Sequence, residues 1–520
     1  MERETFFSKQ RIIAKPGFNR WLVPPAALAI HLCIGMAYGF SVFWLPLSEY
    51  GLTCAEQTLW QQLITSTCSW KISSLGWIYT LFFIFLGCSA ALWGKWLEKA
   101  GPRKVGFIAT LCWCGGLTLA AIGVREHQLW LMWLGAGATG GIGLGLGYIS
   151  PVSTLLRWFP DKKGMAAGLA IMGFGGGAMA GAPLATALMR FYATNGDPGV
   201  WQSLLTLAAL YFVAMMAGTL SYRIPPFGWQ PGNWRLSQAA NAAAKVQVHV
   251  QTAMKMPQFW LLWLVLCLNV SAGIGVLGMA SPLFQEVIEN RAGRVDLAVV
   301  AAGFTGLLSL FNILGRFFWA SLSDYIGRKA TFSLFFLAGA LLYLLLPRFA
   351  TGSHLILFLL SICLVISMYG GGFATIPAYL ADVFGTKMVG AIHGRLLTAW
   401  SAAGIIGPVL VNYLREYQLA SGLSGVEAYR VTLYILSGLL VAGQVFNMLV
   451  HPAAEKYAMS SEELADAAAA YRPLAGRHLS WHADPASWKR VAVSWALVLV
   501  PLAWGVYMTL AGILTLFWQA

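Results

Sequence analysis

Two polar side chains lie four residues apart in a stretch that is otherwise apolar enough to cross a membrane. Asn312 and Arg316 belong to the run 298–320. A guanidinium in such a stretch keeps its proton at any workable pH. Placing its charge in the membrane costs about 2.5 kcal/mol or more. Positions i and i+4 of a helix share a face, so the Asn312 amide can orient the Arg316 guanidinium. An arginine kept in a membrane at that cost usually faces a wet cavity and meets an anion; the alternative for Arg316 is a structural tie to helix-end carbonyls or to the neighbouring half.

Three other polar side chains inside apolar runs are candidates for the same cavity. Arg395 lies eight residues beyond Lys387, roughly 12 Å along a helix. It is either a second cation for the anion, a residue lining the entrance, or a side chain that snorkels to the membrane surface. His31 and His393 are the histidines deepest in the first twelve runs. Imidazole titrates near neutral pH, so each either carries a coupling proton or packs and hydrogen-bonds within the protein.

The patterns that mark common enzyme and metal sites are missing from the sequence. It contains no HExxH, CxxC or GxSxG pattern and no Walker-type phosphate loop. We therefore expect no enzymatic activity, no catalytic residues, no metal site and no cofactor.

The composition indicates a protein that crosses the membrane many times. Of 520 residues, 58% are hydrophobic and 10% are charged, against about 25% charged residues in soluble proteins. The mean hydropathy is +0.67. The excess of Lys and Arg (34) over Asp and Glu (20) is spread over short loops. We therefore expect the lipid bilayer as a partner, and no nucleic acid.

Thirteen apolar runs are long enough, at roughly 20 residues each, to span a bilayer as helices. They predict an all-α polytopic membrane protein with two six-helix bundles and a thirteenth C-terminal helix, which is either a peripheral stabiliser or a fused small subunit. The expected parts are a cytoplasmic tail (1–20), an N-terminal bundle (21–222), a cytoplasmic linker (223–256), a C-terminal bundle (257–451), a second cytoplasmic linker (452–491) and the extra membrane helix (492–520).

The basic residues predict the orientation of the chain. Lys and Arg are roughly three times as frequent in the segments on the N-terminal side as in those on the other side, which predicts a cytoplasmic N-terminus. Thirteen crossings then place the C-terminus outside the cytoplasm. We expect the plasma membrane, which in a bacterium is the inner membrane. Cys54 and Cys68 share the first outside loop, where they are either free or joined in a disulfide.

The two six-run halves repeat each other. Glu98-x-x-Gly101 recurs as Asp324-x-x-Gly327, and Pro151 recurs as Pro377. Each of these pairs is 226 residues apart. A fixed offset shared by acidic, proline and glycine positions is hard to obtain by chance. Both halves begin on the same side, so the repeat is parallel, as expected for two bundles related by an axis along the membrane normal.

The loop between the second and third runs resembles the signature loop of the major facilitator superfamily. Residues 94–104 read GKWLEKAGPRK and fit the pattern G-x-x-x-D-x-x-G-x-R-[RK], with Glu98 in place of Asp. The corresponding loop of the second half, from Ala320 to Lys329, has alanine at the position of the first glycine. The resemblance implies the major-facilitator fold. We expect the charged residues of both copies to form a gating latch on the cytoplasmic face: Glu98, Arg103, Lys104, Asp324, Arg328 and Lys329.

A narrower resemblance, over residues 20–451, is to the oxalate/formate antiporter family. Six stretches carry it: Gly35–Phe43, Gly143–Tyr148, Arg157–Gly164, Pro257–Trp260, Tyr369–Tyr379 and His393–Trp400. The resemblance implies a secondary active transporter that moves small carboxylates by alternating access. It also implies that a substrate anion meets an arginine in the eighth span, matched by Arg316, and a lysine in the eleventh span, where this chain has Trp400.

The loss of that lysine changes the expected substrate. One cation balances one carboxylate, and a dicarboxylate would leave a negative charge unpaired in a low-dielectric site. We therefore expect a monocarboxylate of the formate, lactate or pyruvate class, moved with a proton or against a counter-anion. The alternatives are an oxalate/formate-type dicarboxylate antiporter and, in a different class, a non-transporting membrane sensor of carboxylates.

Four aromatic residues in these motifs are expected to wall the cavity, each with a ring or a polar tip toward the substrate: Tyr38, Tyr148, Tyr369 and Trp400. The alternative is ordinary packing, which is frequent in a chain with 23 Trp. Related monocarboxylate transporters carry an Asp-x-x-x-Arg pair in the eighth span. Asn312 replaces that Asp here and cannot titrate, so proton coupling would need another carrier.

Overall fold

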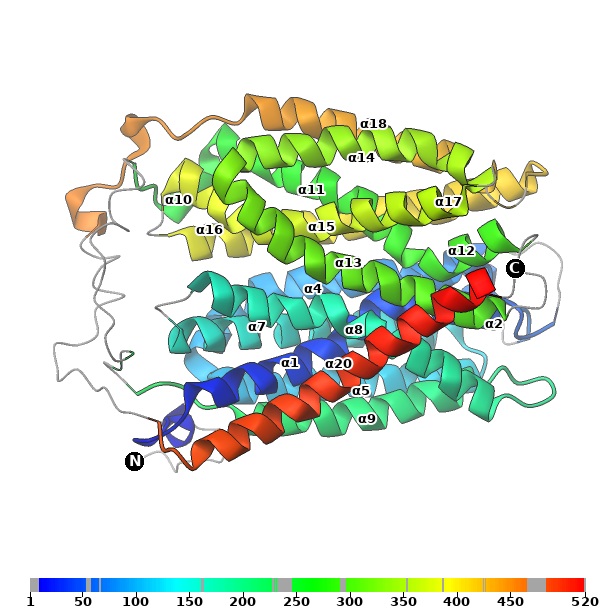
Figure 1. The fold of residues 1–520 in the computed structure, drawn as a ribbon, viewed down its shortest axis with the longest axis horizontal. Coiled ribbons are helices and arrows are strands. Elements are labelled where there is room, and N and C mark those ends of the chain that lie inside the picture. The colour runs from blue at the N-terminus through cyan, green and yellow to red at the C-terminus, as the bar shows by residue number, and fades with distance from the viewer. Residues whose placement is uncertain are drawn as a thin grey trace.

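The computed structural model describes residues 9–52, 58–64, 67–159, 163–226, 229, 231, 246–289, 296–351, 354–385, 388–423, 425, 427–464 and 483–518. Two layers of roughly antiparallel helices lie face to face (Figure 1), one formed by each half of the chain. Thirteen helical spans in the described ranges are long and apolar enough to cross a membrane. The predicted all-α membrane fold, with two six-helix bundles and one extra helix, is confirmed.

The N-terminal bundle holds the first six spans, several of which are broken into shorter helices. Its elements are α1 (Val23–Ile34), the tighter 3-10 segment η3 (Gly35–Phe43), α2 (Trp44–Ser48), α3 (Leu59–Ile64), α4 (Ile72–Ala100), α5 (Pro102–Arg125), α6 (Leu129–Met132), η4 (Trp133–Gly140), α7 (Gly141–Trp158), α8 (Lys163–Tyr192) and α9 (Val200–Ser221). The short helices η1 (Lys9–Ile12) and η2 (Arg20–Leu22) precede them.

The C-terminal bundle repeats this order. After α10 (Val250–Lys255) come α11 (Pro257–Gly278), α12 (Ala280–Ile288), α13 (Leu297–Ile326), α14 (Arg328–Thr351), α15 (Leu355–Phe384), α16 (Val389–Leu396), α17 (Thr398–Ala420) and α18 (Glu427–Leu449). The short η6 (Glu455–Tyr457) and the long α20 (Ser487–Trp518) follow. The helix α20 begins five residues before the predicted boundary at 492, because the polar residues Lys489 and Arg490 form part of its first turns.

The glycines of the repeated loop have a structural reason. Gly101 ends α4 with φ +84°, and its counterpart Gly327 ends α13 with φ +87°. Residues with a Cβ rarely adopt this left-handed region, whereas glycine does so at little cost. The chain therefore reverses sharply at both places, and the next helix begins at once with Pro102 in one half and Arg328 in the other.

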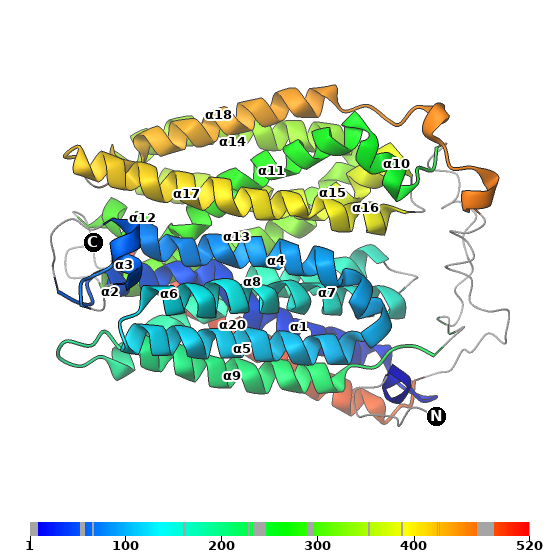
Figure 2. The ribbon, with the colours of Figure 1, turned by 180° about the vertical axis from the view of Figure 1, so that it is seen from behind.

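The two ends of the molecule differ. We call the linker end the one where α1 and α11 begin, and the loop end the one where α12 ends and α13 begins. Figure 1 marks the N-terminus at the linker end and the C-terminus at the loop end, and Figure 2 shows the same arrangement from behind. With thirteen candidate spans in the described ranges, the two ends of the chain lie at opposite ends of the molecule.

The two bundles are joined by hydrogen bonds near the loop end. The indole of Trp44 donates to the Gly278 carbonyl across 2.8 Å, and the indole of Trp77 donates to the Tyr413 hydroxyl across 2.8 Å. The backbone N–H of Ser73, in the first turn of α4, donates to the Glu416 carboxylate across 3.1 Å. A carboxylate at a helix N-terminus is favourable electrostatically. These contacts hold the loop end closed.

A buried ion pair fixes the loop end of the C-terminal bundle. Glu286 of α12 pairs with Arg415 of α17, with side-chain exposures of only 15% and 9%. The Arg415 Nε donates to Glu286 Oε1 across 3.1 Å, and the guanidinium lies over the Tyr429 ring at 5.9 Å. The pair holds the short α12 against α17 and so positions the part of the seventh span that follows the break at Met279.

We predict that Glu286→Gln destabilises the protein strongly, because it leaves the Arg415 charge buried without a counter-charge. Breaking a buried pair from one side typically costs about 3–5 kcal/mol. Thermal unfolding in detergent measures the effect as a lowered midpoint. The matched control is Glu126→Gln, since the Arg125–Glu126 pair is 65% and 61% exposed and such pairs contribute about 1 kcal/mol or less. Equal midpoints for the two variants would contradict the assignment.

Candidate functional site

Arg316 lies buried on α13, facing the seam between the two bundles. It is ten residues from the linker end of α13 at Ile326, roughly 15 Å along the helix axis. Its side chain is 5% exposed. The Nε donates to Asn312 Oδ1 across 3.0 Å, as the i,i+4 spacing predicts. The Nη1 donates to the Ile171 carbonyl of α8 across 3.3 Å, so the arginine bonds to both halves of the molecule.

The seam can approach Arg316 closely because α8 presents a glycine there. A Cβ on Gly175 would lie 3.1 Å from Asn312 Oδ1 and 3.4 Å from Arg316 Nε. A larger side chain at this position would press on both polar groups. The glycine therefore lets the α8 backbone face the guanidinium directly.

Three buried N–H donors in this region have no hydrogen-bond partner within the described residues. They are Arg316 Nη2, Asn312 Nδ2 and the indole Nε1 of Trp400. A buried donor without a partner costs about 1–3 kcal/mol, and more when it is charged. Such a group calls for an explanation, and an oxygen-rich anion would satisfy all three types of donor.

Trp400 is the centre of an aromatic cluster that draws on both bundles. Its ring lies 5.6 Å from Phe83, 5.4 Å from Tyr148 and 5.6 Å from Phe174, all from the N-terminal bundle. From its own bundle, Phe373 lies at 4.5 Å. Phe373 also faces Arg316, with 5.7 Å from the guanidinium carbon to the ring centroid. The cluster therefore connects the predicted cation to the position where the related family has a lysine.

The two tyrosines expected at the cavity wall hydrogen-bond to each other. The hydroxyls of Tyr38 and Tyr369 are 2.8 Å apart and come from opposite bundles. Both side chains are fully buried. Tyr38 packs on Phe174 at 4.9 Å and Tyr369 on Phe373 at 5.4 Å, so both lie beside the aromatic cluster, and their role at a substrate site stays a prediction. In this conformation, however, their hydroxyls seal the seam and do not point to an open cavity.

The two histidines occupy different places. His31 is fully buried behind the aromatic cluster, with its Nε2 3.2 Å from the Tyr148 carbonyl and its ring 5.4 Å from the Tyr148 ring. His393 lies on α16, seven residues before Trp400, and its Nε2 is buried with no partner in the described part of the chain. His31 therefore supports the wall directly, whereas His393 lies nearer the linker end.

Arg395 does not join Arg316 in this conformation. Its guanidinium donates to the Ala391 carbonyl of its own helix across 3.2 Å, and the side chain is half-buried. It lies one turn and a half before Trp400, on the linker-end side of the cluster. This position fits the entrance better than the place of a second substrate cation.

The basic residues of the predicted latch contact their own bundles. Arg103 donates to the carbonyls of Leu220 and Tyr222 at 3.0 and 3.1 Å. Arg328 pairs with Asp324 and lies 3.8 Å from Asp382. Lys104 is exposed, and the side chain of Glu98 lies outside the described residues.

Lys329 is the last of the predicted latch residues. Its Nζ donates to the carbonyls of Met448 and Val450 at 2.8 Å each. Both carbonyls belong to the C-terminal bundle, so this lysine ties α14 to the end of α18. The latch residues thus hold the helix ends of each half in this conformation, and a contact between the halves remains a prediction.

The predicted disulfide is supported for one of its two cysteines. Cys68 is disulfide-bonded, while its expected partner Cys54 lies outside the described residues. Six other cysteines are free thiols: Cys33, Cys88, Cys112, Cys114, Cys267 and Cys363. The imidazole of His127 bonds the Cys68 carbonyl at 2.7 Å, which anchors this loop at the loop end.

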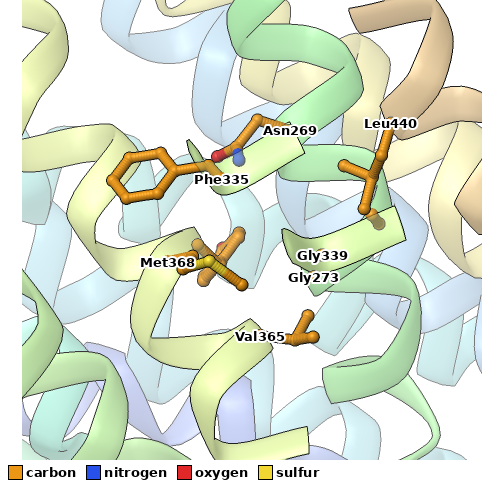
Figure 3. A pocket seen from close by; sticks show the side chains of 9 residues that line it. Asn269, Gly273, Phe335, Gly339, Val365, Met368 and Leu440 are labelled. Atoms are coloured by element: carbon orange, nitrogen blue, oxygen red, sulfur yellow. The ribbon is translucent and has the colours of Figure 1, made fainter. Parts of the chain in front are cut away.

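A small pocket lies inside the C-terminal bundle, apart from Arg316. Figure 3 shows Asn269, Phe335 and Met368 around it, and Tyr369 forms part of its wall. It lies on the side of α15 that faces α11 and α14. The pocket therefore belongs to the interior of one bundle and not to the seam between the two.

Sequence reasoning missed two important members of the site. Phe373 lies four residues after Tyr369 in the same helix, and this i,i+4 spacing could have identified it. Phe174 lies in a glycine-rich run, where no periodic signal distinguishes it. The Ile171 carbonyl was not predictable, because backbone acceptors carry no residue-type signal.

Comparison with known proteins agrees with this architecture. The model of the Major Facilitator Superfamily matches residues 27–408 and 294–520. An oxalate:formate antiporter of Oxalobacter formigenes is 25% identical over 392 residues, or 75% of this chain and 83% of that protein. Apicoplast pyruvate carrier 1 of Toxoplasma gondii is 25% identical over 402 residues, or 68% of this chain and 72% of that protein.

Two further proteins resemble this chain, one in sequence and one in fold. An MFS-type transporter of Escherichia coli strain K12, YhjX, is 22% identical over 390 residues, or 74% of this chain and 86% of that protein. A solved bacterial homologue of the human lysosomal transporter Spinster shares the fold, with a TM-score of 0.59 and 15% identity over 86% of this chain and all of that chain. Together with the two bundles and their repeated loop, the family match shows that the chain belongs to the major facilitator superfamily of transporters.

Proposed function

We propose that this protein carries a small monocarboxylate across the membrane by alternating access, and that Arg316 binds the carboxylate. The observation that carries the proposal is the buried guanidinium with an unpartnered Nη2 at the seam between the bundles. Its charge is fixed, and its Nε is already oriented by Asn312. A carboxylate oxygen accepting from Nη2 would gain a charge-assisted hydrogen bond.

The single cation favours one carboxylate over two. Trp400 supplies a neutral N–H where a lysine would supply a charge, and the rings around it form an apolar wall. A second carboxylate in this surrounding would be desolvated without a counter-charge. The formate, lactate and pyruvate class therefore fits better than oxalate, although oxalate:formate exchange is the activity named for one relative. The pyruvate carrier named for another relative is consistent with our choice.

We infer that the linker end faces the cytoplasm of a cell whose plasma membrane, or bacterial inner membrane, holds the protein. The support is the excess of Lys and Arg on that side. The C-terminus then lies outside, and residues 1–20, 223–256 and 452–491 lie inside. Hydrogen bonds join the bundles at the loop end in the conformation described above, so we expect substrate exchange with the cytoplasmic side to occur while these bonds are in place. The latch residues would join the bundles there when the loop end opens.

The groups that can titrate near neutral pH limit how transport could be coupled to protons. Neither Asn312 nor Arg316 exchanges a proton at neutral pH, so the site itself is no proton carrier. A proton symporter would need His31 or His393, and an exchanger would need only a second anion. We therefore propose proton symport and anion exchange as the two alternatives, and uptake measured with and without a pH gradient distinguishes them.

We predict that Arg316→Ala abolishes carboxylate uptake in proteoliposomes while the protein remains folded. Loss of a charge-assisted bond costs about 1.5–3 kcal/mol, or roughly 10- to 100-fold in affinity. Labelled formate, lactate, pyruvate and oxalate are compared, with an imposed pH gradient and after it is collapsed. Arg125→Ala, on the exposed surface, is the control. Unchanged anion uptake by the Arg316 variant, or uptake of only cationic or neutral solutes, would refute the proposal.

Trp400 is expected to decide between one and two carboxylates. We predict that Trp400→Lys raises the ratio of oxalate to formate uptake by about tenfold, since one added charge pair at a desolvated site contributes 1.4 kcal/mol or more. Trp400→Phe keeps a ring and removes the indole N–H, so it should lower uptake without changing the ratio. Competition assays with both substrates provide the measurement. A wild-type protein that already prefers oxalate would show the dicarboxylate alternative to be correct.

Phe373 is expected to limit the size of the substrate, because its ring packs against both the Arg316 guanidinium and the Trp400 ring. We predict that Phe373→Ala shifts the preference from the shortest acids toward longer or branched monocarboxylates. The ratio of butyrate to formate uptake should rise about tenfold, as one methylene is worth about 1–3 kcal/mol in a pocket. Phe335→Ala, at the pocket inside the C-terminal bundle, should leave the ratio unchanged. An unaltered ratio in the Phe373 variant would exclude this role.

A further inference from the structure

The thirteenth helix crosses from one bundle to the other. Figure 1 shows α20 running diagonally over α1 and α8 and reaching α13 near the loop end. Its contacts are with η2, α1 and α8 of the N-terminal bundle and with α13 of the C-terminal bundle. It therefore lies over the seam that contains Arg316 and Asn312 on one side and Ile171 on the other.

The hydrogen bonds of α20 to other helices attach it to the N-terminal bundle. At the linker end the Asn19 amide donates to the Ser487 hydroxyl across 3.2 Å. The indole of Trp495 donates to the Trp21 carbonyl across 3.2 Å. Farther along, the Thr509 hydroxyl donates to the Met179 carbonyl of α8 across 3.3 Å. These three bonds fix the helix to one half along most of its length.

The contact with α13 is a close packing of small residues near the loop end. A Cβ on Gly303 would lie 3.0 Å from the Ile513 N and the Thr509 carbonyl oxygen, and a Cβ on Gly512 would lie 3.0 Å from the Val299 carbonyl oxygen. A Cβ on Gly306 would overlap Thr509 Oγ1. Thr509 therefore touches both halves, with its hydroxyl bonded to α8 and its side chain seated on the α13 glycine.

The helix also covers the site from the lipid side. Leu502 of α20 lies behind Gly176 of α8 and Ile313 of α13: a Cβ on Gly176 would be 2.8 Å from Ile313 Cδ1 and 3.5 Å from Leu502 Cδ2. The next residues along these helices are Gly175 and Asn312, which face Arg316. A single layer of side chains thus separates α20 from the candidate site.

The seam needs such support at the loop end. The α8–α13 ion pair there, Arg190 with Asp296, has side chains 46% and 55% exposed, and exposed pairs contribute little. Within a membrane, helices associate through close van der Waals packing of small residues, because lipid tails remove the usual hydrophobic drive. The glycine contacts of α20 supply this kind of packing to both sides of the seam.

We propose that α20 is a strap that holds the loop end closed, anchored on the N-terminal bundle and released from α13 when that end opens. The joint is Thr509 against Gly306. Opening the loop end separates the first turns of α13 from the last turns of α8, and this movement has to break the α20–α13 packing. The strap therefore shifts the resting equilibrium toward the conformation closed at the loop end. It does not depend on which solute is carried.

A thiol-accessibility experiment on substrate-free protein tests the strap. The six free cysteines are replaced by alanine, and Ser73→Cys is added as the reporter, because Ser73 is buried at the closed loop end. Gly306→Ala pushes Thr509 away, so reaction of Cys at 73 with a membrane-impermeant maleimide should become about threefold faster or more. The double variant Gly306→Ala with Thr509→Ala removes the overlap with Oγ1, keeps the two anchoring bonds at Ser487 and Trp495, and should restore the slow rate. Thr509→Ala alone shows what the loss of the bond to Met179 contributes. Ala503→Val, on the exposed face of α20, is the control.

The outcomes decide the proposal in either direction. Faster labelling in Gly306→Ala that the second substitution reverses supports the strap, because the reversal assigns the effect to the contact between residues 306 and 509. Equal rates in all variants would mean that α20 is a passive attachment. Slower labelling in Gly306→Ala would mean that the contact favours an open loop end, which also overturns the proposal. Because no solute is added, failure of carboxylate uptake leaves this test unaffected.

Discussion

The buried guanidinium of Arg316 is the constraint on which the rest of the structure depends. It cannot lose its charge, and removing an unpaired ion from water costs several kcal/mol in a protein interior. The surrounding residues reduce this cost only in part: an amide oxygen, one backbone carbonyl, the face of one ring and the nearby Tyr38 hydroxyl. One of those acceptors, the Ile171 carbonyl, belongs to the opposite bundle. Relative movement of the bundles therefore changes the solvation of the charge directly, and a bound anion would replace what that movement removes.

The aromatic cluster gives the charge its low-dielectric surrounding. Rings from both bundles meet at Trp400, and the hydroxyl pair of Tyr38 and Tyr369 joins the bundles beside them. Electrostatic interactions are stronger where water is excluded, so the same rings increase both the attraction for an anion and the cost of leaving the cation alone. The proposed site and the contacts between the bundles thus use the same side chains, so we expect closing the seam and occupying the site to be linked.

The sequence predicts features that lie along a single helix better than features that lie between helices. The Asn312–Arg316 bond follows from i,i+4 spacing, and the sharp reversals at Gly101 and Gly327 follow from the repeated loop. The bond between Tyr38 and Tyr369 joins residues 331 positions apart, and the Glu286–Arg415 pair joins residues 129 apart. Spacing specifies which side chains share a helix face. It does not specify which faces meet across a seam, and in a chain this apolar almost every face is a candidate.

The helix ends at the two ends of the molecule are held by different kinds of interaction. The loop end has glycine packing under α20, indole hydrogen bonds and the buried Glu286–Arg415 pair, and from Val491 to Trp518 α20 carries no Lys, Arg, Asp, Glu or His. The linker end has Arg328 with Asp324, whose carboxylate side chain is 64% exposed, and several other basic groups. Salt weakens interactions between exposed charges, with a Debye length of about 10 Å at 0.1 M, and leaves dry packing almost untouched. Ionic strength should therefore act on the linker end, while the loop end responds to side-chain volume at the α20–α13 contact.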